Sequence, residues 1–213
     1  MKKLIICLMI LLVSGCTVVR IDTKSLDNTI AVVLSKNNKL HNRIGKGYKY
    51  YIPRGVNYID TNEYNDKLYS DGNYYYLYID AISYYYGKEL DYEVNHNAYY
   101  SKKLDYNGHQ GYVEINQQTS GKYLIEFMYN YAKIEALVDK DDIEKVILNS
   151  SYILSTIKFN NNVIKLMLDD DFFVNKEEKY DIFSTKENVD TSNYLEYSQD
   201  KGNEWGGLYG ING

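Results

Sequence analysis

Apolar and small residues recur at helical spacing in two segments of the chain. In residues 25–37 they fall at i, i+4, i+7 and i+8, and after Asp141 and Asp142 they fall at i, i+3, i+4, i+7, i+11 and i+14. The first set is Leu26, Ile30, Val33 and Leu34, and the second is Ile143, Val146, Ile147, Ser150, Leu154 and Ile157. Each set lies on one helical face, so we predict two amphipathic helices. Ser25 and the two aspartates are suited to cap their N-termini.

The chain between these helices has the composition and the turn signals of β-strands. The predicted strands are residues 48–52, 56–59, 73–86, 99–106, 111–116 and 123–131, and the segment 73–86 is a long or broken strand. Residues 132–138 continue the last of these strands or form the next one. A short helical turn is expected in residues 61–69, and residues 163–168 fit a helix or a strand. Asp71-Gly72 and Asn107-Gly108 predict tight hairpin turns. Residues 99–138 therefore predict an antiparallel meander. The order of elements predicts an α+β fold, an antiparallel β-sheet with helices packed on it.

Two short motifs in this pattern resemble a known family. YKYYIPRGV at residues 48–56 ends a strand at Pro53, and ILSTIKF at residues 153–159 lies at the end of the second helix. Together with the early helix and the hairpins, over about residues 25–160, they resemble the PsbP-like family of photosystem subunits and bacterial envelope lipoproteins. The resemblance implies an α/β/α sandwich and an accessory or ligand-binding role. It carries over no site residue, because no site motif of the family is present.

The N-terminus has the pattern of a lipoprotein signal. Lys2 and Lys3 precede ten apolar residues, 4–13, which suit a signal peptide and are too few to span a bilayer. Val13-Ser14-Gly15-Cys16 resembles the lipobox of bacterial lipoproteins. This resemblance implies cleavage before Cys16 and a diacylglycerol on its thiol. We therefore expect a lipid-anchored protein on the extracytoplasmic face of the cell membrane.

These patterns predict the organisation of the chain. Residues 1–15 are the expected signal peptide and residues 16–24 a tether. Residues 25–160 form the expected α+β domain. Residues 161–200 are an extension packed on or near that domain, and the polar, glycine-rich residues 201–213 are a flexible tail.

Charge and cysteine content exclude several classes of function. The chain has 24 basic and 29 acidic side chains, a net charge of −5, whereas a nucleic-acid binder needs a basic face. Nucleic acid is therefore not an expected partner. The two cysteines are Cys7 in the signal and Cys16 at the lipidation site. The mature domain is thus expected to contain no disulfide, no catalytic thiol and no cysteine metal site.

No motif of catalysis or of metal binding is recognisable. His41, His96 and His109 stand in none of the spacings typical of zinc sites. The acidic clusters at residues 139–144 and 169–171 lack the glycine of a calcium-binding loop. Acidic pairs are too numerous for sequence alone to indicate a glycosidase. We therefore expect no enzyme activity, no catalytic residue, no metal and no cofactor.

Tyrosine is the residue that stands out, with 26 of 213 positions. In a strand Tyr74, Tyr76 and Tyr78 share one face and Tyr75 takes the other. These three, with Tyr84 and Tyr86, are the candidate ligand-facing residues. They stack on glycan rings or on a partner if one face of the sheet is exposed, and they are core if both faces are covered.

These observations lead to three expected functions. The first is a non-catalytic binding or accessory role in the cell envelope, with the membrane as a partner through the lipid anchor. The other partner is then another envelope protein or a cell-wall glycan. The second is glycan or peptidoglycan binding through exposed tyrosines. The third is an envelope hydrolase with unrecognised carboxylates.

Overall fold

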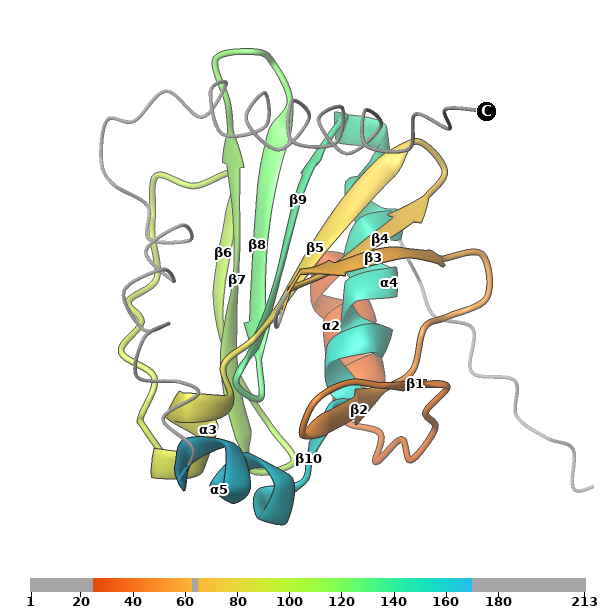
Figure 1. Cartoon of the computed structure of the whole chain (residues 1–213). Coiled ribbons are helices and arrows are strands. Elements are labelled where there is room, and N and C mark those ends of the chain that lie inside the picture. The colour runs from red at the N-terminus through yellow and green to blue at the C-terminus, as the bar shows by residue number, and fades with distance from the viewer. Residues whose placement is uncertain (1–24, 63–64, 170–213) are drawn as a thin grey trace, which may run out of the picture. The chain divides into compact units, whose positions relative to one another are not determined.

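The computed structural model describes residues 25–62 and 65–169 (Figure 1). The helices are α2 (Leu26–Leu34), α3 (Ala81–Tyr86), α4 (Ile143–Ser155) and α5 (Asn161–Asp169), and a 3₁₀ turn, η1 (Lys140–Asp142), precedes α4. The strands are β1 (Arg43–Ile44), β2 (Tyr48–Tyr50), β3 (Asn57–Asn62), β4 (Asn65–Ser70), β5 (Asn73–Ile79), β6 (Tyr100–Tyr106), β7 (His109–Gln117), β8 (Tyr123–Tyr129), β9 (Ala132–Val138) and β10 (Lys158–Phe159). The expected signal peptide, tether and tail, and the extension from residue 170 onward, lie outside these ranges.

Seven strands form one antiparallel sheet in the order β3-β4-β5-β9-β8-β7-β6. The meander predicted for residues 99–138 is confirmed, because β6, β7, β8 and β9 pair in sequence order. The hairpin of β4 and β5 joins the meander where β5 pairs with β9, with Leu77 opposite Ile134. The α+β fold class is thus confirmed.

Helices α2 and α4 pack on each other and on one face of this sheet. The predicted apolar stripes are buried: Ile30, Val33 and Leu34 on α2 and Val146, Ile147 and Leu154 on α4. They meet the alternate strand residues Val113, Ile115, Ile125, Phe127, Ile134 and Leu77, all fully buried. The period of two on the strands and of about 3.6 on the helices therefore builds one core. The PsbP-like resemblance implies a second helical layer on the other face of the sheet. Among the described residues, helices α2 and α4 form a layer on one face only.

The predicted helix starts differ in how they are capped. Ser25 caps α2 as expected, because its hydroxyl accepts a hydrogen bond from the Asn28 amide. The capping predicted for Asp141 and Asp142 is wrong in detail, because the Asp142 side chain makes no cap hydrogen bond and α4 follows a 3₁₀ turn. The Asp142 carboxylate instead accepts a hydrogen bond from the Asn73 amide, at 3.0 Å.

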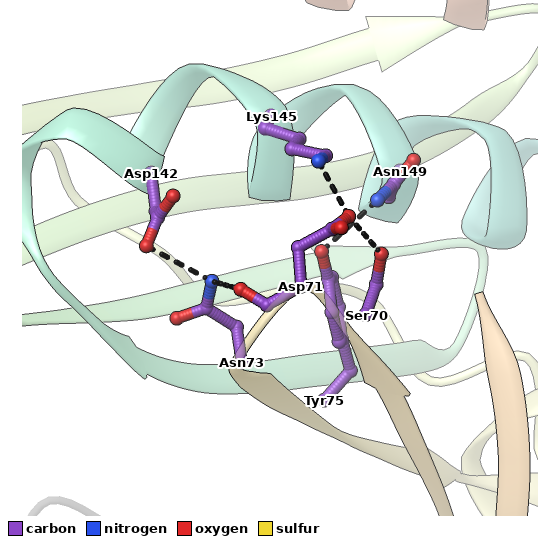
Figure 2. A network of polar contacts seen from close by, with 7 residues as sticks. All are labelled: Ser70, Asp71, Asn73, Tyr75, Asp142, Lys145 and Asn149. Atoms are coloured by element: carbon purple, nitrogen blue, oxygen red, sulfur yellow. Dashed lines mark hydrogen bonds and ion pairs between the residues drawn. The ribbon is translucent and has the colours of Figure 1, made fainter. Parts of the chain in front are cut away.

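That contact belongs to a polar network between the β4–β5 turn and α4, shown in Figure 2. Its members are Ser70, Asp71, Asn73, Tyr75, Asp142, Lys145 and Asn149. Asp71 has a positive φ of 48°, as the predicted Asp-Gly hairpin turn requires, and its carboxylate pairs with Lys145. On the adjacent turn of the helix, Asn149 donates to the Tyr75 hydroxyl at 3.0 Å. The network ties the hairpin tip to the helix far from it in sequence.

Two predicted elements were wrong. The helical turn expected in residues 61–69 is not found in the described part of this segment, because residues 61–62 end β3 and residues 65–69 form most of β4, with Thr61 opposite Asp66. The strand predicted for residues 73–86 ends at Ile79, and residues 81–86 form helix α3. Asp80 caps this helix by accepting a hydrogen bond from the Ser83 amide, and Gly87 ends it in the left-handed conformation. Local capping thus outweighed the β-propensity of three consecutive tyrosines.

A second, small sheet lies at one end of the domain and has the order β1-β2-β10. It is joined to the large sheet by buried Asp66 of β4, whose carboxylate accepts hydrogen bonds from Tyr50 and Thr61, each at 2.5 Å. Burial, and then the nearby Asp66 charge, raise the pKa of Tyr50. Helix α5 resolves the ambiguity of residues 163–168 in favour of a helix, and it buries Ile164 completely. The start of the predicted extension therefore packs on the domain.

Candidate functional site

The five tyrosines predicted to face a ligand do not form one surface. Tyr74, Tyr76 and Tyr78 of β5 share the sheet face opposite α2 and α4, while Tyr75 is fully buried on the helix side. Tyr74 is 42% exposed, and Tyr76 and Tyr78 are partly buried. The other two tyrosines, Tyr84 and Tyr86, lie on helix α3. The alternation predicted for Tyr74, Tyr76 and Tyr78 is therefore confirmed, whereas Tyr84 and Tyr86 do not belong to this strand.

The ring faces of this tyrosine row already have a partner. The Lys67 ammonium lies 4.4 Å from the centroid of the Tyr74 ring and 5.6 Å from that of Tyr76. Tyr69 packs against Tyr74 with their centroids 5.1 Å apart. Cation–π contacts of this kind hold the rings in place. The row is thus a packed strip of sheet surface rather than a hollow.

Three glutamates continue the same face across the meander. Glu114, Glu126 and Glu135 occupy directly opposite positions on β7, β8 and β9. Lys133 reaches two of them, with its ammonium 2.7 Å from Glu135 and 3.8 Å from Glu126. Burial, and secondarily the charges of its neighbours Glu135 and Glu114, raise the pKa of Glu126 to about 7, although Lys133 acts in the opposite direction. This row brings together carboxylates of the kind that the hydrolase hypothesis requires, and the hypothesis stays a prediction.

Helices α3 and α5 and strand β10 lie at the same end of the domain (Figure 1). Tyr84 of α3 lines a hollow there, together with residues of α5 and β10. The hollow has two compartments, of about 320 Å³ and about 790 Å³. The smaller is lined by Leu34, Lys36, Asn37, Asn38, Tyr84, Asn107, His109, Tyr129, Asn130, Ser155, Ile157, Lys158 and Phe159. The larger is lined by Ile44, Gly45, Lys46, Gly47, Tyr48, Lys49, Tyr84, Lys158, Phe159, Asn160, Asn161, Asn162, Val163 and Met167. Both volumes are in the usual range of small-ligand sites.

Two stacked rings are shared by the linings of the two compartments. The rings of Tyr84 and Phe159 are 3.9 Å apart at their centroids and inclined by 14°, and both residues line both compartments. The Tyr84 hydroxyl donates to the side-chain oxygen of Asn161 at 2.7 Å, and Tyr131 meets the Tyr84 ring edge-on. Tyr84 is therefore held from three sides. Tyr86, two residues further on, is 64% exposed and lines neither compartment.

A glycine turn shapes the larger compartment. Gly45-Lys46-Gly47 connects β1 to β2, and Gly47 has a φ of +80°. The Gly47 carbonyl accepts a hydrogen bond from the Asn160 amide, which fixes the turn to the start of α5. A Cβ on Gly47 would lie 2.9 Å from a side-chain carbon of Ile164. The turn therefore reaches the wall of the hollow only because it carries no side chain there.

The charged groups that the described residues contribute to both linings are all basic. Lys36 and Lys158 line the smaller compartment, and Lys46, Lys49 and Lys158 line the larger. Within residues 25–62 and 65–169, no aspartate or glutamate lines either compartment. Partial burial lowers the pKa of His109, so this residue adds a neutral imidazole near pH 7 rather than a charge. In a chain with a net charge of −5, this end of the domain is locally cationic.

Two of these lysines face each other across paired strands. Lys49 of β2 and Lys158 of β10 are direct partners in the antiparallel register. Within the described ranges neither forms an ion pair, and Lys36 does not either. Like charges at directly opposite positions destabilise a sheet. The arrangement is unfavourable unless an anion lies between or beside the two ammonium groups.

The sequence analysis proposes Tyr84 as a ligand-facing residue and gives no indication of the other residues that line this hollow. None of its motifs includes residues 45–47 or 160–162. A weak signal was present, namely two glycines around a lysine near a short strand. Within residues 25–62 and 65–169 no group of three or more His, Cys, Asp or Glu side chains is placed to hold a metal ion. No helix of this part of the chain is long and apolar enough to cross a membrane.

Comparison of the chain with protein-family models, with curated proteins and with solved structures gave no match.

Proposed function

We propose that this protein is a membrane-anchored, extracytoplasmic binding protein with a non-catalytic role, and that it binds an anionic ligand in the hollow between α3, α5 and the small sheet. The observation that carries the proposal is the lining of the hollow. Among the described residues, the lining contains Lys36, Lys46, Lys49 and Lys158 and no carboxylate. The anchoring part of the proposal rests on the lipobox at Cys16.

Electrostatics favours an anion over a neutral or cationic ligand. Lys49 and Lys158 are opposite each other without a carboxylate partner among the described residues. An anion placed between two ammonium groups converts a mutual repulsion into two attractions. Since the site is concave and partly shielded from water, each attraction is stronger than on an open surface. The ligand thus relieves a cost that the fold already carries.

The anchoring part predicts a change of location for Cys16→Ser. Without the thiol no diacylglycerol is attached, and we expect the variant to move from the membrane fraction to the soluble or secreted fraction. Metabolic labelling with a fatty acid should mark the natural chain and not the variant. Cys7→Ser is the matched control and should leave both results unchanged. An unlabelled natural chain, or a Cys16→Ser variant that stays in the membrane, would contradict the lipid anchor.

The binding part predicts that Lys49→Ala and Lys158→Ala each weaken binding of a multivalent anion. The probe is inorganic tripolyphosphate, titrated calorimetrically into the full chain purified from membranes in detergent. We expect each variant to lower the affinity by about tenfold, which corresponds to roughly 1.4 kcal/mol, within the range for a charge-assisted contact. Raising the salt concentration should weaken binding to the natural chain.

The control variant is Lys103→Ala, whose side chain is exposed on β6, outside both linings. It should bind tripolyphosphate as the natural chain does. An equal loss of affinity in Lys103→Ala would show that tripolyphosphate binding depends only on the overall charge of the protein. The absence of any heat of binding to the natural chain would refute an anion site in the hollow.

A further inference from the structure

We propose that the ligand of the hollow is an acidic glycan of at least two sugar units, with one unit in each compartment and the chain contacting the Tyr84–Phe159 stack. This inference rests on the proposed function, because it names the chemical class of the anion. Three features of the hollow support it: the shared pair of aromatic rings, the concentration of amide side chains and the distribution of the lysines.

The shared ring pair indicates a ring-containing ligand with more than one unit. Tyr84 and Phe159 line both compartments, so a molecule that occupies both contacts the stacked ring pair. One face of each ring is covered by the other ring, and the apolar ring surface that lines the compartments suits the C–H bonds of a sugar ring. A bare inorganic anion gains nothing from such a surface. The ring pair therefore favours a ligand that has an apolar face as well as charge.

The amide side chains indicate a ligand rich in hydroxyl groups. Asn37, Asn38, Asn107 and Asn130 line the smaller compartment, and Asn160, Asn161 and Asn162 line the larger. A hydroxyl group both donates and accepts hydrogen bonds, and an amide side chain offers both functions. A phosphate or carboxylate alone requires only donors. The described part of the lining thus has seven asparagines and no acid, which matches a molecule that carries hydroxyls and negative charge.

Several of these amide side chains form a hydrogen bond through only one of their two polar atoms. Asn107 and Asn130 donate from their amide nitrogens to the carbonyls of Leu34 and Ile157, at 2.7 and 3.0 Å. Asn161 instead accepts from the Tyr84 hydroxyl. The opposite end of each of these amides forms no hydrogen bond with any described residue. Each group is therefore oriented before a ligand arrives, which lowers the entropic cost of binding.

The lysines are spread along the whole length of the hollow. Lys36 lines only the smaller compartment, Lys46 and Lys49 line only the larger, and Lys158 lines both. A single compact anion would need one focus of positive charge. A chain with an acidic group on each unit matches a row of cations on both sides of the ring pair. The same chemistry is present in carboxylated and in phosphorylated glycans, and the experiment below distinguishes them.

The test measures how affinity for the full chain in detergent depends on ligand length, charge and ring. Galacturonic acid, digalacturonate and trigalacturonate vary the length at constant chemistry. Their methyl esters remove the charge and keep the sugar, while tripolyphosphate keeps the charge and removes the sugar. Glucose 6-phosphate, compared with galacturonic acid, tests whether a phosphate is preferred to a carboxylate on a single unit. We expect trigalacturonate to bind at least tenfold more tightly than the monomer and its methyl ester to bind at least tenfold more weakly.

Variants locate the binding to the ring pair. Tyr84→Ala should lower the affinity for trigalacturonate by about tenfold and leave tripolyphosphate binding within about twofold, since only the sugar uses the ring. Tyr84→Phe keeps the stack, loses the hydroxyl bond to Asn161 and should retain most of the affinity. If Tyr84→Ala unfolds, Tyr84→Phe is the variant in which trigalacturonate binding is measured, because it keeps the ring pair. Tyr74→Ala, on the sheet face, is the matched control and should be unchanged.

The outcomes separate this inference from the proposed function. If tripolyphosphate binds and the galacturonates show no dependence on length or on Tyr84, the acidic glycan is wrong and the anion site stands. If no anion binds, both are wrong. A loss of affinity in Tyr74→Ala but not in Tyr84→Ala would transfer glycan binding to the tyrosine row of β5 and overturn the inference. Binding to phosphatidylglycerol vesicles that trigalacturonate does not inhibit would assign the lysines to a membrane surface instead, which also overturns it.

Discussion

Gly111→Ala is expected to destabilise the fold by about 3 kcal/mol, one of the largest effects of any single methyl group in this protein. A Cβ at this position would lie 2.1 Å from the Met128 carbonyl oxygen and 2.8 Å from the Tyr129 Cα. Both obstacles are backbone atoms of the neighbouring strand β8, so no side-chain rotation relieves the contact. Gly111 pairs with Tyr129 in the register, and moving either strand would disturb the centre of the meander.

The measurement is urea unfolding followed by circular dichroism. Gly108→Ala is the matched control: its φ of +74° makes alanine unfavourable, but no atom lies within 4 Å of the added Cβ. Backbone conformation alone costs about 1 kcal/mol for a non-glycine residue at such an angle. We therefore expect a clearly larger loss for Gly111→Ala than for Gly108→Ala. Equal losses would mean that β7 and β8 separate easily and that the close approach is not a constraint.

Glu126→Gln is expected to stabilise the protein at alkaline pH and to have little effect in acid. Glu126 is only 6% exposed, and burial raises its pKa from the ordinary value of 4.5 to about 7. The folded state therefore binds a proton more tightly than the unfolded state does. Such a group contributes its full stability below about pH 4.5, and this contribution is lost as the pH rises through about 7.

The size of the effect follows from the two pKa values. Their difference corresponds to about 3 kcal/mol, which the natural chain loses between about pH 4.5 and pH 8 through this residue. Glutamine does not ionise, so the variant avoids the loss, although it forgoes the attraction between Glu126 and Lys133 at 3.8 Å. Lys133 keeps its closer partner Glu135. We expect a net gain of roughly 1 to 3 kcal/mol at pH 8.

Chemical unfolding at a series of pH values between 4.5 and 8 measures this prediction. The informative quantity is the difference in unfolding free energy between the variant and the natural chain at each pH. Glu144→Gln, at an exposed position on α4, is the control and should show no trend of this size. A difference that does not change with pH would indicate that Glu126 has the same proton affinity in the folded and unfolded states.

Local signals in the sequence were sufficient for most of the elements. The stripes beginning at Leu26 and Ile143 predicted α2 and α4, and the Asp71-Gly72 and Asn107-Gly108 turns predicted two hairpins, because both depend on contacts between near neighbours. The errors arose where local preferences compete. Tyr84 and its two tyrosine neighbours favour a strand, yet the cap at Asp80 starts a helix there. In residues 61–62 and 65–69, pairing between strands β3, β4 and β5 took precedence over a local turn.

The candidate site depended far more on tertiary contacts. The sequence placed Tyr74, Tyr76, Tyr78, Tyr84 and Tyr86 in one group, but the end of β5 at Ile79 sends the last two to a different part of the domain. The opposition of Lys49 and Lys158 joins residues 109 positions apart, through a three-residue and a two-residue strand. No periodicity in so short a segment indicates its partner.

The amino-acid sequence by itself determined the α+β class, the two helices, the meander and the expectation of a lipid anchor at Cys16. These follow from short-range patterns whose physical basis is the geometry of a single helix, strand, turn or signal. Only the tertiary structure decided which charges meet, namely the glutamates across β7, β8 and β9 and the lysines around the hollow. The reason is that strand register and helix packing, set by burial of the whole core, bring together side chains whose spacing in sequence carries no signal.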